Sequence, residues 1–217
     1  MKADMRSIVI VGIGGFGREV VDVIDAINDG QGGPTFDLVG MLDDSPRAED
    51  LARIKERGID FMGAVDDFVK TAPAVEYVIG IANPRAREAI DAKFTKAGSS
   101  AAVLVHPDTT LGSMIDLGPG SIICAGVRMT TNIRLGRHVH VNINTTVGHD
   151  SHLGDYTTFN PVVSVSGDCT IEPGASMGVG SAVLQGLTVG RGSFVGAGAL
   201  VTRSVAENVV VKGVPAR

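Results

Sequence analysis

In the second half of the chain, an apolar residue recurs at every sixth position. Counting by six from Val105 to Val201 gives 17 positions, and each holds Val, Leu, Ile, Met or Phe. Only 44% of all residues are hydrophobic, so chance would give such a run roughly once in a million sequences, and we take the repeat as genuine. Eight of these positions are followed directly by glycine: Gly112, Gly118, Gly136, Gly148, Gly154, Gly178, Gly190 and Gly196.

This period predicts a coil built from short strands. One apolar side chain in each six-residue unit points inward, and Gly or Asn takes the turn conformation in which a Cβ would be strained. Three units close one coil of 18 residues, and stacked coils pair as parallel strands at ~4.8 Å. Residues 104 to 206 hold five to six such coils. A repetitive β-sandwich is the alternative fold for this half.

The first half has a different pattern, in which apolar strands alternate with helix-like stretches. The helix-like stretches are residues 18–27, 48–57 and 85–97. Three strands are expected, each preceding one of these stretches: one starts at Ser7, and the others cover residues 36–42 and 75–81. Such alternation is typical of a parallel sheet covered by helices. We therefore expect a Rossmann-like α/β domain over residues 1–102 and the coiled domain over residues 103–217.

Glycine and acidic residues stand where the expected strands end. Gly12-x-Gly14-x-x-Gly17 follows the first strand, and glycines there permit a tight turn and a close approach of phosphate to the N-terminus of the next helix. Asp43 and Asp44 follow the second strand, where a carboxylate can accept hydrogen bonds from a ribose or a base. NAD is the common ligand of such a glycine motif, but a β-coil is not the second domain of a dehydrogenase.

Composition and charge exclude several functional classes. A net charge of -5, a pI near 5.5 and 4% aromatic residues argue against a nucleic-acid-binding protein. Cys124 and Cys169 are too few for a disulfide framework or a metal quartet, and they suit a reducing cytoplasm. The five histidines lack the spacing of a zinc trio, so we expect no metal. No segment approaches the ~18 uninterrupted apolar residues of a membrane span, so we expect no membrane insertion.

His149 and Asp150 are the candidate catalytic pair. His149 lies two residues after the inward Val147 and so projects outward from a corner. A neutral imidazole near pH 7 can take a proton from an attacking amine or hydroxyl, and a neighbouring carboxylate can fix its tautomer. One coil further along is Gly167, which leaves room for a thioester and exposes an N–H for a developing oxyanion. A solvated histidine and an ordinary turn glycine are the alternatives.

The coils and the end of the chain resemble the hexapeptide-repeat acyltransferases, which fold as left-handed parallel β-helices. The resemblance rests on the repeat itself and on the closing segments 195–202 (VGAGALVT) and 212–217 (KGVPAR). It implies acetyl-CoA as the acyl donor, bound near the last coils by Ala197, Arg203 and Lys212. From Pro173 onward the chain has four cationic residues and one anionic residue, which suits a cofactor that carries phosphates.

Four motifs span the two halves: the Gly-rich turn, the Asp pair, Asn83-x-x-x-Arg87 and Asn142-x-x-x-x-Val-Gly-His149-Asp150. In this combination they resemble the family of sialic-acid O-acetyltransferases and amino-sugar N-acetyltransferases. The resemblance implies that His149 is the general base and that Asp150 orients it. It implies a nucleotide-sugar site made of Gly12, Gly14, Gly17, Asp43, Asp44, Asn83, Arg87 and Asn142. Many members have a second histidine nine residues after the first, where this chain has Thr158, and we place Thr158 with Gly167 at the acetyl-CoA.

We therefore expect an acetyl-CoA-dependent N-acetyltransferase acting on a nucleotide-linked amino sugar, for a bacterial surface glycan. The resemblance implies a homotrimer with three sites in the grooves between β-helices, and the cysteine content leads us to expect it in the cytoplasm. The first alternative is an O-acetyltransferase of sialic acid or of another surface sugar, which would use the same residues. The second is a non-catalytic nucleotide-binding β-helix protein. The intact pair His149 and Asp150 argues against the second alternative.

Overall fold

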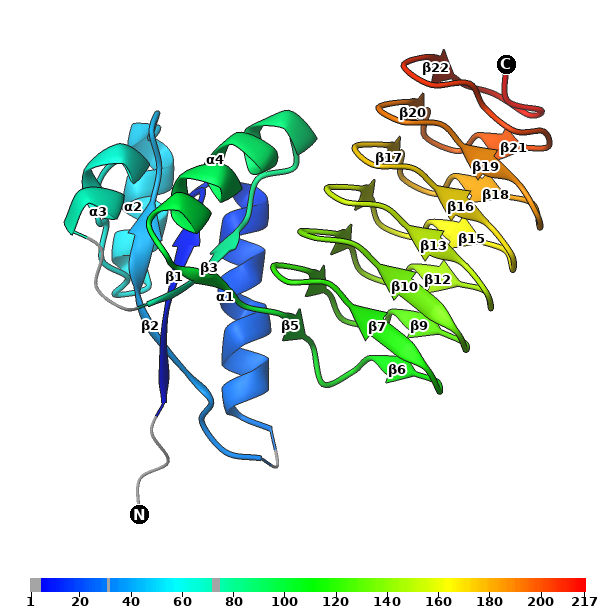
Figure 1. The fold of residues 1–217 in the computed structure, drawn as a ribbon. Coiled ribbons are helices and arrows are strands. Elements are labelled where there is room, and N and C mark those ends of the chain that lie inside the picture. The colour runs from blue at the N-terminus through cyan, green and yellow to red at the C-terminus, as the bar shows by residue number, and fades with distance from the viewer. Residues whose placement is uncertain (1–4, 31, 72–74) are drawn as a thin grey trace. The chain divides into compact units, whose positions relative to one another are not determined.

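The structure, a computed structural model, describes residues 5–30, 32–71 and 75–217. It divides into two compact units, residues 1–107 and 108–217, a few residues beyond the boundary expected from the sequence (Figure 1). In the described residues, α-helices occur in the first unit alone. They are α1 (Gly15–Asn28), α2 (Ala48–Glu56), α3 (Val65–Thr71) and α4 (Pro84–Lys96).

Strands make up the other regular elements. Those of the first unit are β1 (Arg6–Val11), β2 (Phe36–Leu42), β3 (Glu76–Ile79), β4 (Ser100–Ala101) and β5 (Leu104–Val105). Those of the second unit are β6 (Thr110–Leu111), β7 (Ile115–Leu117), β8 (Ile122–Ile123), β9 (Arg128–Met129), β10 (Ile133–Leu135), β11 (His140–Val141), β12 (Thr146–Val147), β13 (His152–Leu153), β14 (Thr158–Phe159), β15 (Ser164–Val165), β16 (Thr170–Ile171), β17 (Ser176–Met177), β18 (Ala182–Val183), β19 (Thr188–Val189), β20 (Phe194–Val195), β21 (Leu200–Val201) and β22 (Val210–Val211).

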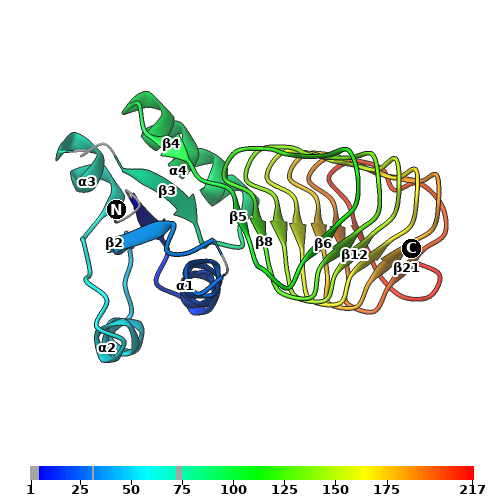
Figure 2. The ribbon, with the colours of Figure 1, turned by 90° about the horizontal axis from the view of Figure 1, so that it is seen from below.

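The first unit is a parallel sheet with the strand order β2-β1-β3-β4. Helices cover both of its faces, with α1 and α4 on opposite sides (Figure 2). After β1 the chain adds β2 on one side of that strand and then β3 on the other side. The direction in which strands are added therefore reverses between β1 and β3. Open α/β sheets bind ligands at the carboxyl ends of the strands beside such a reversal. The loops after β1 and β3 are therefore the expected ligand-binding loops of this unit.

Alternating apolar side chains build the core on the α3 and α4 face of this sheet. Val9 and Val11 of β1 join Tyr77 of β3 in one buried cluster with Phe68 and Phe94 from the two helices. The rings of Tyr77 and Phe94 stack with their centroids 4.3 Å apart. Burial on both faces explains why the strands appear in the sequence as continuous apolar runs rather than as strict alternation.

The six-residue period determines where the strands of the second unit end and how its coils stack. Each of the strands β6 to β21 ends on one of the 17 periodic apolar positions, as does β5 just before the unit boundary, and the positions from Ile123 to Val201 are all buried. Each strand pairs in parallel with the strand one coil along, as Val147 does with Val165 and Val165 with Val183. The coils therefore stack in a register of 18 residues, in three sheets.

The corners of the coils need left-handed backbone conformations. At one corner the residues in successive coils are Asn132, Asp150, Asp168 and Gly186, with φ of 55°, 58°, 59° and 75°. Asn and Asp are the side chains that tolerate this region best after Gly. In these four coils the corner that carries the candidate catalytic carboxylate is thus occupied by Asn, Asp or Gly, stacked one above another.

The last coil is shorter than the others. Phe194 pairs with Val210, a register of two residues fewer than the usual 18. The chain then turns, and Leu200 of β21 donates its N–H to the carbonyl of Gly213 and accepts from the N–H of Ala216. The terminal segment thereby satisfies the backbone groups of a strand that would otherwise be an open edge.

The predicted fold class is confirmed: an N-terminal α/β domain precedes a left-handed parallel β-helix of about 6 turns. Some element boundaries differ from the expected ones. Helix α1 begins at Gly15 rather than at Arg18, because Gly14 serves as its N-cap and Gly17 lies within its first turns. The third strand ends at Ile79 instead of at residue 81, and the short helix α3 has no counterpart among the predicted elements.

Candidate active site

The predicted catalytic pair lies on the corner that follows strand β12. Nδ1 of His149 is 2.7 Å from Oδ2 of Asp150, and both side chains are half exposed at 49%. The other carboxylate oxygen, Oδ1, accepts a hydrogen bond of 2.5 Å from Nδ2 of Asn132, one coil below. The hydrogen bond from Asn132, and next that from His149, lowers the pKa of Asp150 below its usual value. An ionised Asp150 holds the proton on Nδ1, which leaves the lone pair of Nε2 available to accept a proton.

Gly167 lies against the other side of the imidazole ring. A Cβ built on this residue would be 2.5 Å from Nε2 of His149 and 2.6 Å from Cε1. The coil above is tied to the same corner, because the N–H of Asp168 donates to the carbonyl of His149 over 2.6 Å. The register of 18 residues therefore brings Gly167 next to the atom that would take the proton. Any larger residue at this position would displace the ring.

Asn142 and Thr158 are buried in the coil wall. Nδ2 of Asn142 donates to the carbonyl of Phe159 over 2.8 Å, and Asn160 makes the same bond to Met177 one coil along. Thr158 is 3% exposed and is paired in register with His140 and Ser176. The contacts of Asn142 therefore support the coil, and the substrate role of Asn142 and the cofactor role of Thr158 stay predictions.

The three residues assigned to acetyl-CoA near the end of the chain are all exposed: Ala197, Arg203 and Lys212. Arg203 lies in the same column as His149, three coils along, because Val147, Val165, Val183 and Val201 stack in one register. At ~4.8 Å per coil this separates the two residues by roughly 14 Å along the helix axis. Backbone hydrogen bonds of 3.0 and 3.1 Å join Lys212 to Arg217 in the closing turn.

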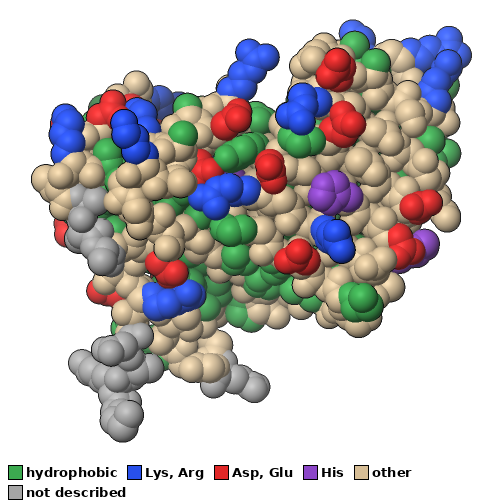
Figure 3. All heavy atoms as spheres, viewed as in Figure 1, with side chains coloured by type: hydrophobic (Ala, Val, Ile, Leu, Met, Phe, Trp, Pro, Cys, Tyr) green, Lys and Arg blue, Asp and Glu red, His purple; other side chains and the backbone are tan. Residues whose placement is uncertain are grey.

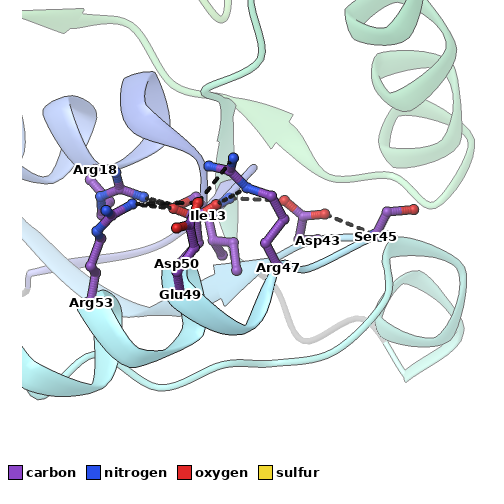
Figure 4. A network of polar contacts seen from close by, with 8 residues as sticks. All are labelled: Ile13, Arg18, Asp43, Ser45, Arg47, Glu49, Asp50 and Arg53. Atoms are coloured by element: carbon purple, nitrogen blue, oxygen red, sulfur yellow. Dashed lines mark hydrogen bonds and ion pairs between the residues drawn. The ribbon is translucent and has the colours of Figure 1, made fainter.

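In the first unit, the Gly-rich turn is held from two sides (Figure 4). The N–H of Ile13 donates to Oδ2 of Asp43 over 3.1 Å, and its carbonyl accepts from Nη1 of Arg18 over 2.7 Å. Arg18 is in turn bound to Oδ1 of Asp50 at 2.5 Å. Asp50 is almost fully buried and also binds Arg47 and Arg53. The hydrogen bond from Arg47, joined by those from Arg18 and Arg53, lowers the pKa of Asp50 to about 2.

The three glycines of this turn differ in what surrounds them: Gly12 and Gly17 are closely packed, whereas Gly14 faces open space. Gly12 has a φ of 101°, which favours glycine, and a Cβ on Gly17 would lie 1.8 Å from the carbonyl oxygen of Gly12. These two residues let the helix pack directly on the turn. A Cβ on Gly14 would meet nothing within 4 Å, and the same holds for Gly15. The open space beside Gly14 is where a ligand could approach the N-terminus of α1.

Three further residues assigned to the nucleotide sugar have structural partners. Oδ1 of Asp44 accepts from the N–H of Val65 at the start of α3, over 2.8 Å. Asn83 caps α4 by accepting from the N–H of Ala86 over 3.1 Å. Arg87 is fully buried, and its Nη1 donates to the carbonyls of residues 81 and 82 over 2.9 and 2.8 Å. These contacts shape the loops at the strand ends, and binding of a nucleotide sugar by these residues stays a prediction.

Comparison with known proteins assigns the chain to a family. Residues 7–94 match the family model of the PglD N-terminal domain. The GDP-perosamine N-acetyltransferase of Escherichia coli O157:H7 is 32% identical over 159 residues, which cover 73% of this chain and 69% of that protein. This chain belongs to the nucleotide-amino-sugar acetyltransferase family. The predicted family and enzyme class, an acyl-CoA-dependent sugar acetyltransferase, are thereby confirmed.

Solved structures of this family extend the similarity to nearly the whole chain. WeeI from Acinetobacter baumannii AYE is 30% identical with a TM-score of 0.83, over 98% of this chain and 99% of that one. The acetyltransferase domain of PglB from Neisseria gonorrhoeae FA1090, in complex with acetyl coenzyme A, is 26% identical with a TM-score of 0.87, over 98% of both chains. PerB from Caulobacter crescentus, in complex with CoA and GDP-perosamine, is 25% identical with a TM-score of 0.85, over 97% and 96%.

Sequence reasoning missed two parts of the candidate site. Asn132 precedes Asp150 by 18 residues, so the coil arithmetic that selected Gly167 above the histidine also selects Asn132 below the carboxylate. Arg18 and Asp50 had a weaker signal, since only the position of Arg18 directly after the Gly motif points to the turn. An ion pair between residues 32 positions apart cannot be recognised without the fold.

Other kinds of site receive no support from the described part of the chain. No group of three or more His, Cys, Asp and Glu residues there could hold a metal ion. None of the helices in that part has the length and apolar character needed to cross a membrane. Acidic and basic side chains are interspersed on the face drawn in Figure 3, which differs from the single-sign surface of a nucleic-acid-binding protein.

Proposed function

We propose that this protein transfers the acetyl group of acetyl-CoA to the amine of a nucleotide-linked amino sugar, with His149 as the general base. The observation that carries this proposal is the arrangement around the imidazole. Asp150 binds Nδ1 at 2.7 Å, and Gly167 places no side chain against the ring near Nε2. A base oriented by a carboxylate, with space for a reacting group next to its lone pair, is what proton removal during acyl transfer requires.

The reaction then follows from the positions of these groups. The amine nitrogen attacks the thioester carbonyl while Nε2 of His149 accepts a proton from it, and a C–N bond forms. The N–H of Gly167 stabilises the negative oxygen of the tetrahedral intermediate. The intermediate collapses with cleavage of the C–S bond, and the imidazolium returns the proton to the sulfur of CoA. Asp150 remains ionised throughout and stabilises the imidazolium.

Gly167 and Arg203 lie in line with His149 along the β-helix, one and three coils further on, and this arrangement supports a site for CoA along that face. Arg203 lies roughly 14 Å from His149 along the axis, at ~4.8 Å for each of three coils. A guanidinium at that distance suits phosphate groups at the far end of a pantetheine arm whose thioester is at the histidine. Ala197, without a long side chain, and Lys212 complete the proposed surface. Thr158 would act near the acetyl group in place of the second histidine of many relatives.

We assign the nucleotide sugar to the first domain, residues 1–102, and acyl transfer to residues 103–217. The order reversal in the sheet supports this assignment, because the Gly-rich turn and the loop at Asn83 both follow strands at that point. Asp43 and Arg18 fix the turn so that Gly14 stays accessible. A rigid turn with an open N-terminal helix end is suited to a diphosphate.

The proposed enzyme works as a homotrimer in the cytoplasm, with sites in the grooves between neighbouring β-helices. Support comes from exposed apolar side chains on the coils: Ile143, Val162 and Val179 are 45%, 56% and 51% exposed. Apolar side chains at successive coils are typical of a surface that another copy covers. Light scattering at working concentration should give three times the mass of the chain, and a monomer would contradict the shared-site arrangement.

The activity is tested by CoA thiol release from acetyl-CoA with a panel of acceptors. Two relatives are named for GDP-perosamine, so it joins UDP-linked 4-amino sugars in the panel, beside free sialic acids. We expect release with a nucleotide-linked amino sugar and a product that survives hydroxylamine, as an amide does. A hydroxylamine-labile product from a sialic acid would instead identify an O-acetyltransferase. Binding of a nucleotide with no thiol release from any acceptor would favour the non-catalytic alternative.

A further inference from the structure

Asp150 is held by both of its oxygens. Oδ2 lies 2.7 Å from Nδ1 of His149, and Oδ1 lies 2.5 Å from Nδ2 of Asn132. The second of these contacts belongs to a residue for which no role has been assigned. In the described part of the chain, no lysine or arginine forms an ion pair with Asp150. The orientation of this half-exposed carboxylate therefore depends on a neutral amide.

The fold places that amide with little freedom. Asn132 and Asp150 occupy the same corner in adjacent coils, with φ of 55° and 58°. Both backbones are fixed to the coil below, because Asn132 donates its N–H to Ser113 over 3.0 Å and Asp150 donates its own to Thr131 over 3.1 Å. Gly, Asn and Asp adopt this left-handed conformation at the lowest cost, although Met114 also adopts it at the same corner, one coil below Asn132, with a φ of 58°. Of these three, Asn alone can donate a hydrogen bond from its side chain.

We propose that Asn132 is a positioning residue, which holds Asp150 in the orientation that accepts the Nδ1 proton of His149. This inference rests on the proposed function of His149 as the base. Without the amide, Oδ1 of Asp150 is hydrated by water instead. The carboxylate then also adopts rotamers in which Oδ2 no longer contacts Nδ1 of His149. The imidazole then spends part of its time in the other tautomer, with the proton on Nε2. In that tautomer the ring cannot accept a proton from the amine.

The variant Asn132→Gly tests this inference because glycine keeps the corner conformation and removes only the donor. We expect kcat to fall by roughly 10-fold to 100-fold, the range known for removal of a partner that orients a metal-bound histidine. The KM values for acetyl-CoA and for the sugar should change less than about two-fold, because Asn132 touches neither substrate in the proposal. Asn132→Asp should reduce kcat further, since it replaces the donor with a second negative charge.

Two controls separate positioning from damage to the coil. Asn144 is an exposed corner residue with a φ of 57°, on another corner of the same coil as Asp150. Asn144→Gly should leave kcat unchanged, and an equal loss in both variants would show that any corner asparagine matters only for structure. In an Asp150→Gly background, which keeps the left-handed corner, Asn132→Gly should have no further effect on kcat if it acts through the carboxylate.

A readout without catalysis keeps this inference distinct from the proposed function. In protein labelled with ¹⁵N-histidine, the ring shifts of His149, assigned with His149→Ala, report which nitrogen carries the proton. We expect the Nδ1–H tautomer in the wild type and a mixture in Asn132→Gly. If the wild type transfers no acetyl group, the proposed function fails, and the tautomer alone decides the role of Asn132. Unchanged ring shifts in Asn132→Gly, or an unchanged kcat in the active enzyme, would overturn the inference.

Discussion

Adding one methyl group at Gly167 should disable the base without disturbing the fold. The Cβ of an alanine would lie 2.5 Å from Nε2 of His149, 2.6 Å from Cε1 and 2.9 Å from Cδ2. Ordinary contacts between such atoms begin near ~3.5 Å, so the ring must retreat by roughly 1 Å. The backbone of Gly167 is outside the left-handed region, so alanine adds no strain to the main chain.

The size of the effect follows from this displacement. The imidazole is half exposed, so the ring moves rather than the coil, and we expect the free energy of unfolding to change by less than about 1 kcal/mol. A misplacement of about 1 Å at a reacting group costs roughly 100-fold in rate, or about 2.7 kcal/mol. The ring also leaves its 2.7 Å contact with Asp150. The expected result is a fall of about 100-fold in kcat/KM for Gly167→Ala.

The assay is steady-state CoA release with saturating nucleotide amino sugar, accompanied by thermal melting of each variant. Gly32→Ala is the matched control, because its Cβ would meet nothing within 4 Å. The decisive comparison is the double variant with His149→Ala. If Gly167 acts through the imidazole, Gly167→Ala should cost little more activity once the imidazole is absent. Wild-type kcat/KM in Gly167→Ala, or a full 100-fold further loss in the double variant, would refute the reasoning.

Three other predictions concern the first domain. Gly17→Ala places a Cβ against the carbonyl of Gly12 and should destabilise this domain by about 2 kcal/mol or more. Gly15→Ala should not destabilise it, and equal melting temperatures of the two variants would contradict this prediction. The pKa of Asp50 is about 2 in the folded protein and ~3.9 in the unfolded chain, so the ionised carboxylate stabilises the fold fully above pH ~3.9 and this stabilisation is lost as the pH falls through 2. Asp50→Asn should therefore melt at a lower temperature than the wild type at pH 7, and the two melting temperatures should converge toward pH 2; a difference that does not depend on pH would contradict this. By calorimetry, Asp44→Ala should weaken nucleotide-sugar binding and leave acetyl-CoA binding unchanged; tight NAD binding with no response to nucleotide sugars would refute the substrate assignment.

The β-helix could be predicted almost residue by residue because its structure is periodic. A register of 18 residues fixes which side chains stack, so the neighbour of His149 at Gly167 could be named from arithmetic alone. The same arithmetic applied downward gives Asn132 beside Asp150. In a solenoid, sequence separation translates directly into distance, and this is why the site on the corner was recognisable before the fold was known.

The candidate site in the α/β domain was harder to predict from the sequence, because polar residues at strand ends can serve either of two purposes. A carboxylate or amide at a strand end can bind a ligand or cap a helix, and the local pattern is the same for both. Asp44 bonds to the start of α3, a helix of seven residues that no periodicity revealed. Arg87 was assigned to the nucleotide-sugar site by resemblance, yet its guanidinium is buried against carbonyls of the preceding loop. Such partners are set by tertiary contacts that a single sequence does not display.

The central claim is that His149 removes the proton during acetyl transfer, and one substitution tests it most directly. CoA release should be measured for the wild type and for His149→Ala at neutral pH, with saturating acetyl-CoA and nucleotide amino sugar. Loss of a general base predicts a fall in kcat of roughly 10² to 10⁴. Folding and nucleotide-sugar binding should be unchanged, because the side chain is half exposed on a corner of the coil. Turnover of His149→Ala near the wild-type rate would contradict the account.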